Sequence, residues 1–247
     1  DVNIPQLRFF AALGRAHPDA LFFAGDQGQR IFQLPFSWKS IGVDIRGRSH
    51  SLRVNYRTSH QIRGMADRLL DAELADVDGV TESRKGTVSV FNSPDPTLVV
   101  AVSQEDEART IAHWLRERIA DGLLPGEIGV FVRSRNEVER ARSAIQSAGL
   151  STTSPAPGVD AEPGKVVLMP MHLAKGMEFR AVVVAACDED VLPLQERVES
   201  VAEESDLEDV YNTERYLLYV ACTRARDHLL VTAIAPGSEF LSDLGNR

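Results

Sequence analysis

The segment from Glu214 to Arg226 places two arginines at the end of a helical pattern, and this is the clearest chemistry in the sequence. The apolar residues of the segment recur on one helix face that can pack on a sheet: Leu217, Leu218, Val220 and Ala221. Arg224 and Arg226 follow, just before a strand-like run. They can be solvated charges that the helix dipole favours at a helix end. Alternatively, one of them is a guanidinium that stabilises charge developing on a transferred phosphate.

Two earlier segments carry groups that suit a phosphate. Gln29 follows an apolar run at 20–24 that predicts a strand ending in Gly-Asp. Open α/β sheets bind ligands at the carboxyl ends of strands, where an amide can hydrogen-bond a phosphate oxygen or a water. Arg57 precedes a predicted helix with Ser59 as N-cap, and its guanidinium offers a fork of donors. An ordinary turn and a surface arginine paired with a carboxylate remain the alternatives.

A third segment, residues 167–179, runs from a predicted buried strand into His172, Lys175, Gly176 and Glu178. Gly176 permits a tight turn with positive φ. His172 and Lys175 can contact a nucleic-acid backbone, while Glu178 can bond a ribose or orient an arginine. A lone histidine is more often structural, but the ordered set His-x-x-Lys-Gly-x-Glu-Phe is far less expected by chance.

The surrounding pattern predicts an α/β fold. Apolar runs predict strands at 88–91, 98–102, 128–132, 166–169, 181–185 and 228–233. Helical spacing of apolar residues predicts helices at 5–14, 59 to about 75, 105–120, 136–148 and 213–223. Strands that alternate with helices of this length form βαβ units and a parallel sheet with helices on both faces. Residues 76–86 and 151–164 read as loops, and the acidic stretch 195–209 as a mobile excursion.

Composition and charge narrow the possible classes. The chain of 247 residues is 43% hydrophobic, with few aromatic residues, which suits a buried parallel sheet. The net charge of −9 argues against a surface coated with basic groups for nucleic acid. Six arginines lie between residues 46 and 68, however, and they can form a local phosphate-binding face despite the negative net charge.

The sequence also suggests where the protein works. We expect a cytoplasmic protein without membrane partners, because no apolar stretch approaches the roughly 20 residues of a membrane span and no signal peptide is visible. Cys187 and Cys222 show no metal-ligand spacing, so neither a metal site nor a disulfide is predicted.

Taken in chain order, the four segments that contain these candidate residues resemble the later signature motifs of the UvrD/Rep/PcrA family of superfamily 1A DNA helicases. Gly-Asp-x-x-Gln-x-Ile resembles motif III, Asn-Tyr-Arg-Thr motif IV, His-x-x-Lys-Gly-x-Glu-Phe motif V, and Leu-Tyr-Val-Ala-x-Thr-Arg-Ala-Arg motif VI. The first three residues are similar to the end of motif II. The resemblance implies that residues 1–50 are the tail of a first RecA-like domain and that residues 51–247 form the second.

The resemblance also implies roles for individual residues. Gln29 would couple the γ-phosphate to DNA binding, and Arg57 and Arg224 would contact that phosphate as catalytic arginines. Glu178 would be the polar anchor of the nucleotide site, and His172, with the adjacent motif V residue Lys175, would contact single-stranded DNA. Translocation from 3′ to 5′ is the family's polarity.

The sequence departs from the family pattern in three respects. It contains no Gly-x-x-x-x-Gly-Lys-Ser/Thr phosphate loop, so ATP and Mg²⁺ would be held by an upstream RecA-like lobe and neither would bind tightly to this chain alone. The accessory domain expected between motifs IV and V is absent or reduced. After motif III, Phe32 or Trp38 can stack on a DNA base or pack between domains.

Three functions therefore remain open. The first is the C-terminal lobe of an ATP-driven helicase or translocase, with single-stranded DNA and the upstream lobe as partners. The second is a lobe of a DNA-stimulated ATPase switch or nuclease-associated subunit that does not unwind DNA. The third is a stand-alone binding module.

Overall fold

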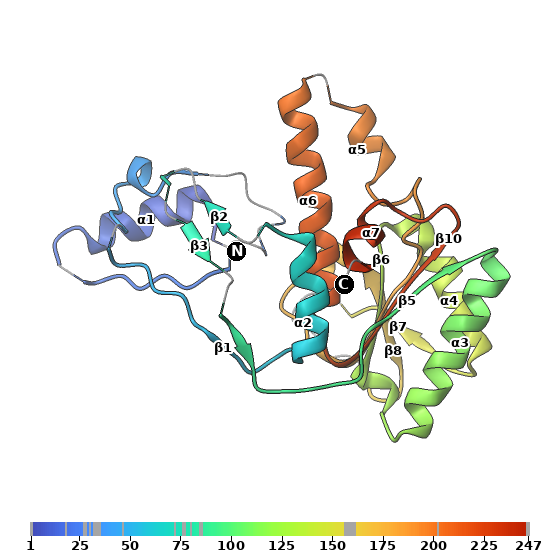
Figure 1. Cartoon of the computed structure of the whole chain (residues 1–247). Coiled ribbons are helices and arrows are strands. Elements are labelled where there is room, and N and C mark those ends of the chain that lie inside the picture. Colours follow the sequence, from blue (N-terminus) through green and yellow to red (C-terminus); the bar gives the residue numbers. More distant parts are fainter. Residues whose placement is uncertain are drawn as a thin grey trace.

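A six-stranded parallel sheet organises the larger, C-terminal part of the molecule in the computed structural model (Figure 1). The structure describes residues 2–17, 19–26, 29, 31, 36–45, 47–71, 73–75, 78–79, 81–83, 86–155, 162–201 and 203–245. The strand order is β5 (Thr97–Ala101), β10 (Ala225–Ile234), β9 (Phe179–Val184), β6 (Ile128–Val132), β8 (Val166–Pro170) and β7 (Thr152–Thr153). Every neighbouring pair is parallel, which confirms the predicted fold class.

Helices cover both faces of the sheet (Figure 1). α3 (Gln104–Ala120) and α4 (Val138–Ser147) pack through residues such as Ile111 and Ile145 on one face. α2 (His60–Ala66), α6 (Glu204–Cys222) and α7 (Phe240–Gly245) share a core with the other face. The strands β6 and β8 are buried along their whole length, because a sheet covered on both faces needs continuous apolar runs.

The first part of the chain lies beside this sheet rather than in it (Figure 1). α1 (Ile4–Gly14) begins at a capping box in which Asn3 and Gln6 bond each other's backbone. A short turn of 3₁₀ helix, η2 (Lys39–Ile41), packs on α1. Two small sheets complete this region: β1 (Val54–Asn55) pairs with β4 (Val88–Ser89), and β2 (Glu73–Ala75) with β3 (Thr81–Ser83).

Two predictions for this region are wrong. Residues 20–24 form no strand, and Phe22 is 92% exposed. A strand needs a neighbour to pair with, and no strand among the described residues pairs with this run. The helix that starts at the predicted N-cap, Ser59, ends at Ala66 instead of near residue 75. It tightens into the 3₁₀ turn η3 (Asp67–Leu69). Residues 73–75 form a strand that pairs with residues 81–83, which lie in the predicted loop 76–86.

The acidic stretch 195–209 is also more ordered than predicted. It forms α5 (Gln195–Glu199) and, from Glu204, the first turns of α6. Carboxylates near the N-terminus of a helix are favourable because of the helix dipole, and Val210 anchors this part of α6 in the core. In the predicted loop 151–164, β7 adds a short strand to the sheet edge, and residues 156–161 lie outside the described residues.

The other predicted strands and helices are present, and most of their ends shift by a few residues. The helix predicted at 213–223 is the exception, because α6 begins at Glu204, and the strand predicted at 88–91 forms β4 in a separate two-stranded sheet. No described helix combines the length and the apolar character needed to cross a membrane. The division of the chain at residue 50 stays a prediction.

Candidate functional site

Arg224 lies between the end of α6 and the start of β10 and is almost fully buried, with 1% of its surface exposed. Its Nε donates to the carbonyl of Val220 (2.9 Å), its Nη1 to the carbonyl of Met177 (3.4 Å), and its Nη2 to Oε1 of Gln29 (3.2 Å). Burial, and then the nearby charge of Arg57, lowers the pKa of Arg224 to about 10, so it stays protonated at neutral pH. The view of Arg224 as a solvated charge at a helix end is therefore wrong.

Arg57 reaches the same carbonyl from motif IV. The side chain of Asn55 accepts hydrogen bonds from the backbone N–H groups of Arg57 (2.8 Å) and Thr58 (3.1 Å), which holds the turn that aims the arginine. Arg57 donates from Nη2 to the carbonyl of Met177, and its Nε lies 3.5 Å from Oε2 of Glu178. Glu178 thus contacts Arg57, and its roles in orienting that arginine or bonding a ribose stay predictions.

Gln29 links the early part of the chain to this pair of arginines. Its Nε2 donates to Asp26 (2.9 Å), its Oε1 accepts from Arg224, and its backbone carbonyl accepts from Nζ of Lys175 (2.8 Å). The expectation that Gln29 lies at the carboxyl edge of a strand is wrong. Its partner Arg224 directly precedes β10, so Gln29 faces the amino edge of the sheet.

Backbone contacts hold these distant segments together. The hydroxyl of Thr58 donates to the carbonyl of Thr223 (3.3 Å), and the N–H of Ser59 donates to the carbonyl of Arg226 (3.2 Å). The N–H of Phe179 donates to the carbonyl of Arg224 (2.9 Å). Motifs IV, V and VI therefore form one connected scaffold at the amino ends of β9 and β10.

This cluster is suited to an anion. Two guanidinium groups converge on one carbonyl oxygen, and an amide and the ammonium group of Lys175 lie beside them. Guanidinium forks match the geometry of phosphate oxygens. Burial, then Arg224, lowers the pKa of Lys175, as expected where cationic groups gather. Tyr56, next to Arg57, is 71% exposed and offers a flat ring that the sequence reasoning did not consider.

The residues predicted to contact DNA lie in different places. His172 follows β8 at the carboxyl edge of the sheet, where Val132 of β6 pairs with Pro170 of β8. Arg135 follows β6 at this edge and is exposed. The sequence reasoning missed Arg135, although its position just after an apolar strand was a usable signal. Lys175, in contrast, contacts Gln29 in the arginine cluster.

Trp38 and Phe32 are the two aromatic residues predicted to stack on a DNA base. Trp38 packs in a cluster with Phe23 and Phe36, at ring-centroid distances of 5.1 Å to each. This is the packing alternative considered above, and base stacking by Trp38 stays a prediction. Phe32 lies outside the described residues.

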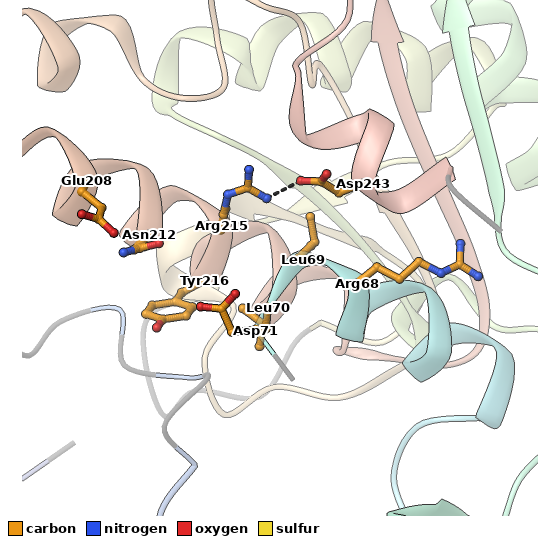
Figure 2. Close-up of a pocket in the computed structure, with 9 residues that line it drawn as sticks. All are labelled: Arg68, Leu69, Leu70, Asp71, Glu208, Asn212, Arg215, Tyr216 and Asp243. Carbon is orange, nitrogen blue, oxygen red and sulfur yellow. Dashed lines mark hydrogen bonds and ion pairs between the residues drawn. The ribbon is translucent and has the colours of Figure 1, made fainter. Parts of the chain in front are cut away.

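A pocket of about 420 Å³ lies away from this cluster, between η3, α6 and α7 (Figure 2). The acidic Asp71, Glu208 and Asp243 outnumber Arg68 and Arg215 in its wall, and Arg215 pairs with Asp243. An excess of carboxylates disfavours phosphate, so we place the nucleotide candidate at the arginine cluster instead. Within the described part of the chain, no group of three or more histidine, cysteine or acidic residues is placed to hold a metal ion.

The histidines lead to a prediction about stability. Burial is the main cause that lowers the pKa of His172 and of His228. The positive charge of Arg133 lowers the pKa of His172 further, and that of Arg118 lowers the pKa of His228. As the pH falls below about 6.5, the unfolded chain takes up protons that the folded chain resists, so the free energy of unfolding should decrease. We expect His228→Gln to weaken this pH dependence between pH 7.5 and 5.5 in urea unfolding. An unchanged dependence would contradict the assignment.

Comparison with known proteins agrees with the fold and the motifs. Residues 142–235 match the family model of the UvrD-like helicase C-terminal domain. A probable DNA helicase of Mycoplasma pneumoniae is 23% identical over 249 residues, which cover 95% of this chain and 42% of that protein. The chain thus spans about two-fifths of the length of this curated relative.

A solved structure of similar fold is the C-terminal domain of a possible DNA helicase from Lactobacillus plantarum WCFS1. It has a TM-score of 0.53 and 22% identity, and the match covers 77% of this chain and 94% of that one. The fold of this chain therefore resembles that of this C-terminal domain. These findings support the resemblance to UvrD-like helicases read from the motifs: residues 142–235 match the C-terminal domain of that family.

Proposed function

We propose that this chain is the C-terminal motor lobe of an ATP-dependent DNA helicase or translocase. In this proposal Arg57 and Arg224 contact the γ-phosphate of an ATP molecule that an upstream lobe holds. The observation that carries the proposal is the convergence of both guanidinium groups, from motifs IV and VI, on the carbonyl of Met177 beside Gln29.

The residues present fit one side of an ATP site. Arg57 and Arg224 can stabilise negative charge on a phosphate during its transfer, Glu178 holds Arg57 in place, and Gln29 senses the phosphate through the same network. Mg²⁺ bound with ATP would neutralise part of the phosphate charge. Neither ATP nor Mg²⁺ is expected to bind tightly to this chain without the upstream lobe.

We further propose that single-stranded DNA passes along the carboxyl edge of the sheet, where His172 and Arg135 lie. Lys175, Trp38 and Phe32 remain candidate contacts. The M. pneumoniae relative, described as a probable DNA helicase, supports DNA as the partner. Movement from 3′ to 5′ is proposed from the motif resemblance.

The decisive experiment compares this chain with the same chain joined to its upstream lobe. We expect ATP hydrolysis stimulated by single-stranded DNA only when both lobes are present, together with displacement of a duplex strand. Hydrolysis without strand displacement would favour an ATPase switch. Robust hydrolysis by this chain alone would contradict the proposal.

Arg135 provides a separate test of DNA binding. In fluorescence anisotropy with oligo-dT, we expect Arg135→Ala to weaken binding and to reduce the slope of log K against log salt by about 0.7, the value for one lost single-strand phosphate contact. Arg109→Ala is the matched control, since its side chain is 77% exposed on α3 and pairs only locally with Asp106. Equal effects of the two changes would argue against DNA at this edge.

A further inference from the structure

A buried ion network connects the edge of the sheet near His172 to α6, the helix that precedes Arg224. Glu214 lies in the middle of α6 and has no exposed surface. Its carboxylate accepts from Nε and Nη2 of Arg133, the latter at 2.5 Å. It also accepts from Nη1 of Arg197 (2.9 Å) and from the backbone N–H of Leu194 (3.3 Å). One carboxylate therefore joins the end of β6, the loop before α5, and α5 itself.

Arg133 connects this network to the carboxyl edge of the sheet. Arg133 directly follows β6, and the pairing of Val132 with Pro170 places it beside the turn that carries His172. Arg133 is itself 6% exposed, and both Nε and Nη2 of its guanidinium donate to the Glu214 carboxylate. Arg135, which is exposed, continues from it in the same turn.

The other end of the connection is the arginine cluster. Glu214 precedes Arg224 by ten residues, which is roughly 15 Å along a helix. The helix between them is packed into the core through Leu217, Leu218 and Val220. A regular, buried helix resists bending, so a shift at Glu214 must be carried to Arg224 largely as a rigid movement.

We infer that Glu214, through its paired contacts with Arg133, is a positioning residue that couples the DNA-facing edge of the lobe to Arg224. The inference rests on the proposed function and adds the route by which DNA would alter ATP turnover. Coupling of two sites requires a physical element that both of them bias, and α6 with its Glu214 network is that element here.

The test removes the ion pair without leaving a buried charge. In the protein with both lobes, the double change Arg133→Leu with Glu214→Leu replaces the pair by apolar side chains, which proteins often tolerate. We expect turnover without DNA, and the DNA concentration for half-maximal stimulation, to stay close to their original values. The maximal stimulation by DNA should fall about tenfold, within the usual range of coupling between sites.

The matched control lies one residue away on the same helix. Arg215 pairs with Asp243 of α7, whereas Glu214 pairs with Arg133 at the end of β6. The double change Arg215→Leu with Asp243→Leu should leave the stimulation intact, and an equal loss in both double variants would overturn the inference. The melting temperature of each variant is measured alongside.

A milder change covers the case in which the double variant does not fold. Arg133→Lys keeps the charge but cannot make the two-pronged contact, so DNA stimulation should still fall several-fold. Full stimulation in this variant would overturn the inference. If the unaltered protein hydrolyses ATP without any response to DNA, the proposed function itself is wrong. If the unaltered protein responds to DNA and the variants respond equally well, only the coupling inference is wrong.

Discussion

Arg224→Ala should reduce DNA-stimulated ATP turnover by about 10³-fold or more in the protein with both lobes, the effect expected for loss of an arginine finger. The physical reason is that Arg224 holds a guanidinium in a site shielded from water, where an electrostatic contact is stronger than at the surface. Its donors already point at the Met177 and Gln29 oxygens. Single-turnover hydrolysis at saturating ATP measures the loss.

Two further variants separate charge from geometry at this position. Arg224→Lys keeps a positive charge but loses the planar fork, and we expect it to recover little of the turnover. Arg226→Ala changes a second arginine at the same helix–strand junction, which pairs with Asp227 (2.8 Å), and should retain most of the activity. If Arg224→Ala folds and turns over ATP like the unaltered protein, the binding-module alternative becomes the better account.

Glu214→Ala should lower the free energy of unfolding of this chain by about 3–5 kcal/mol, because it leaves the Arg133 charge buried and unpaired. The double change to leucine removes both charges and should cost much less, since the desolvation of the ion pair is no longer required. Urea unfolding of the isolated chain measures both values. The energetic contrast between the two variants tests the network independently of any DNA or ATP.

An exposed ion pair provides the reference for this stability measurement. Arg142 and Glu139 lie one turn apart on α4 with 34% and 80% of their side chains exposed. Surface pairs of this kind contribute about 0–1 kcal/mol, so Glu139→Ala should have little effect. A similar small effect of Glu214→Ala would mean that the buried network does not stabilise the fold.

The sheet and most of its helices could be predicted because their patterns are local. The run 128–132 is uniformly apolar and becomes β6 without a change of boundary, and Ser59 caps α2 as predicted. Such signals depend only on residues a few positions apart in the chain. A strand that is buried on both faces must also be apolar along its whole length, which makes it easy to recognise. The run 20–24 carries a similar signal but forms no strand, since a strand also requires a partner that the run itself does not specify.

The types of residue in the motifs also belong to the sequence alone. Gln29, Arg57, Glu178 and Arg224 stand in the order and spacing that resemble the helicase motifs, and residues 142–235 match the UvrD-like helicase C-terminal domain. Only the tertiary structure decided that Arg57 and Arg224 meet at the carbonyl of Met177, that Arg224 is buried, and that Lys175 joins them rather than His172. Likewise, Arg133 and Glu214 lie 81 residues apart in the chain and pair only in the fold. These contacts form only because the folded chain brings each segment to a particular edge of the sheet. Long-range packing determines that edge, and no local sequence pattern encodes it.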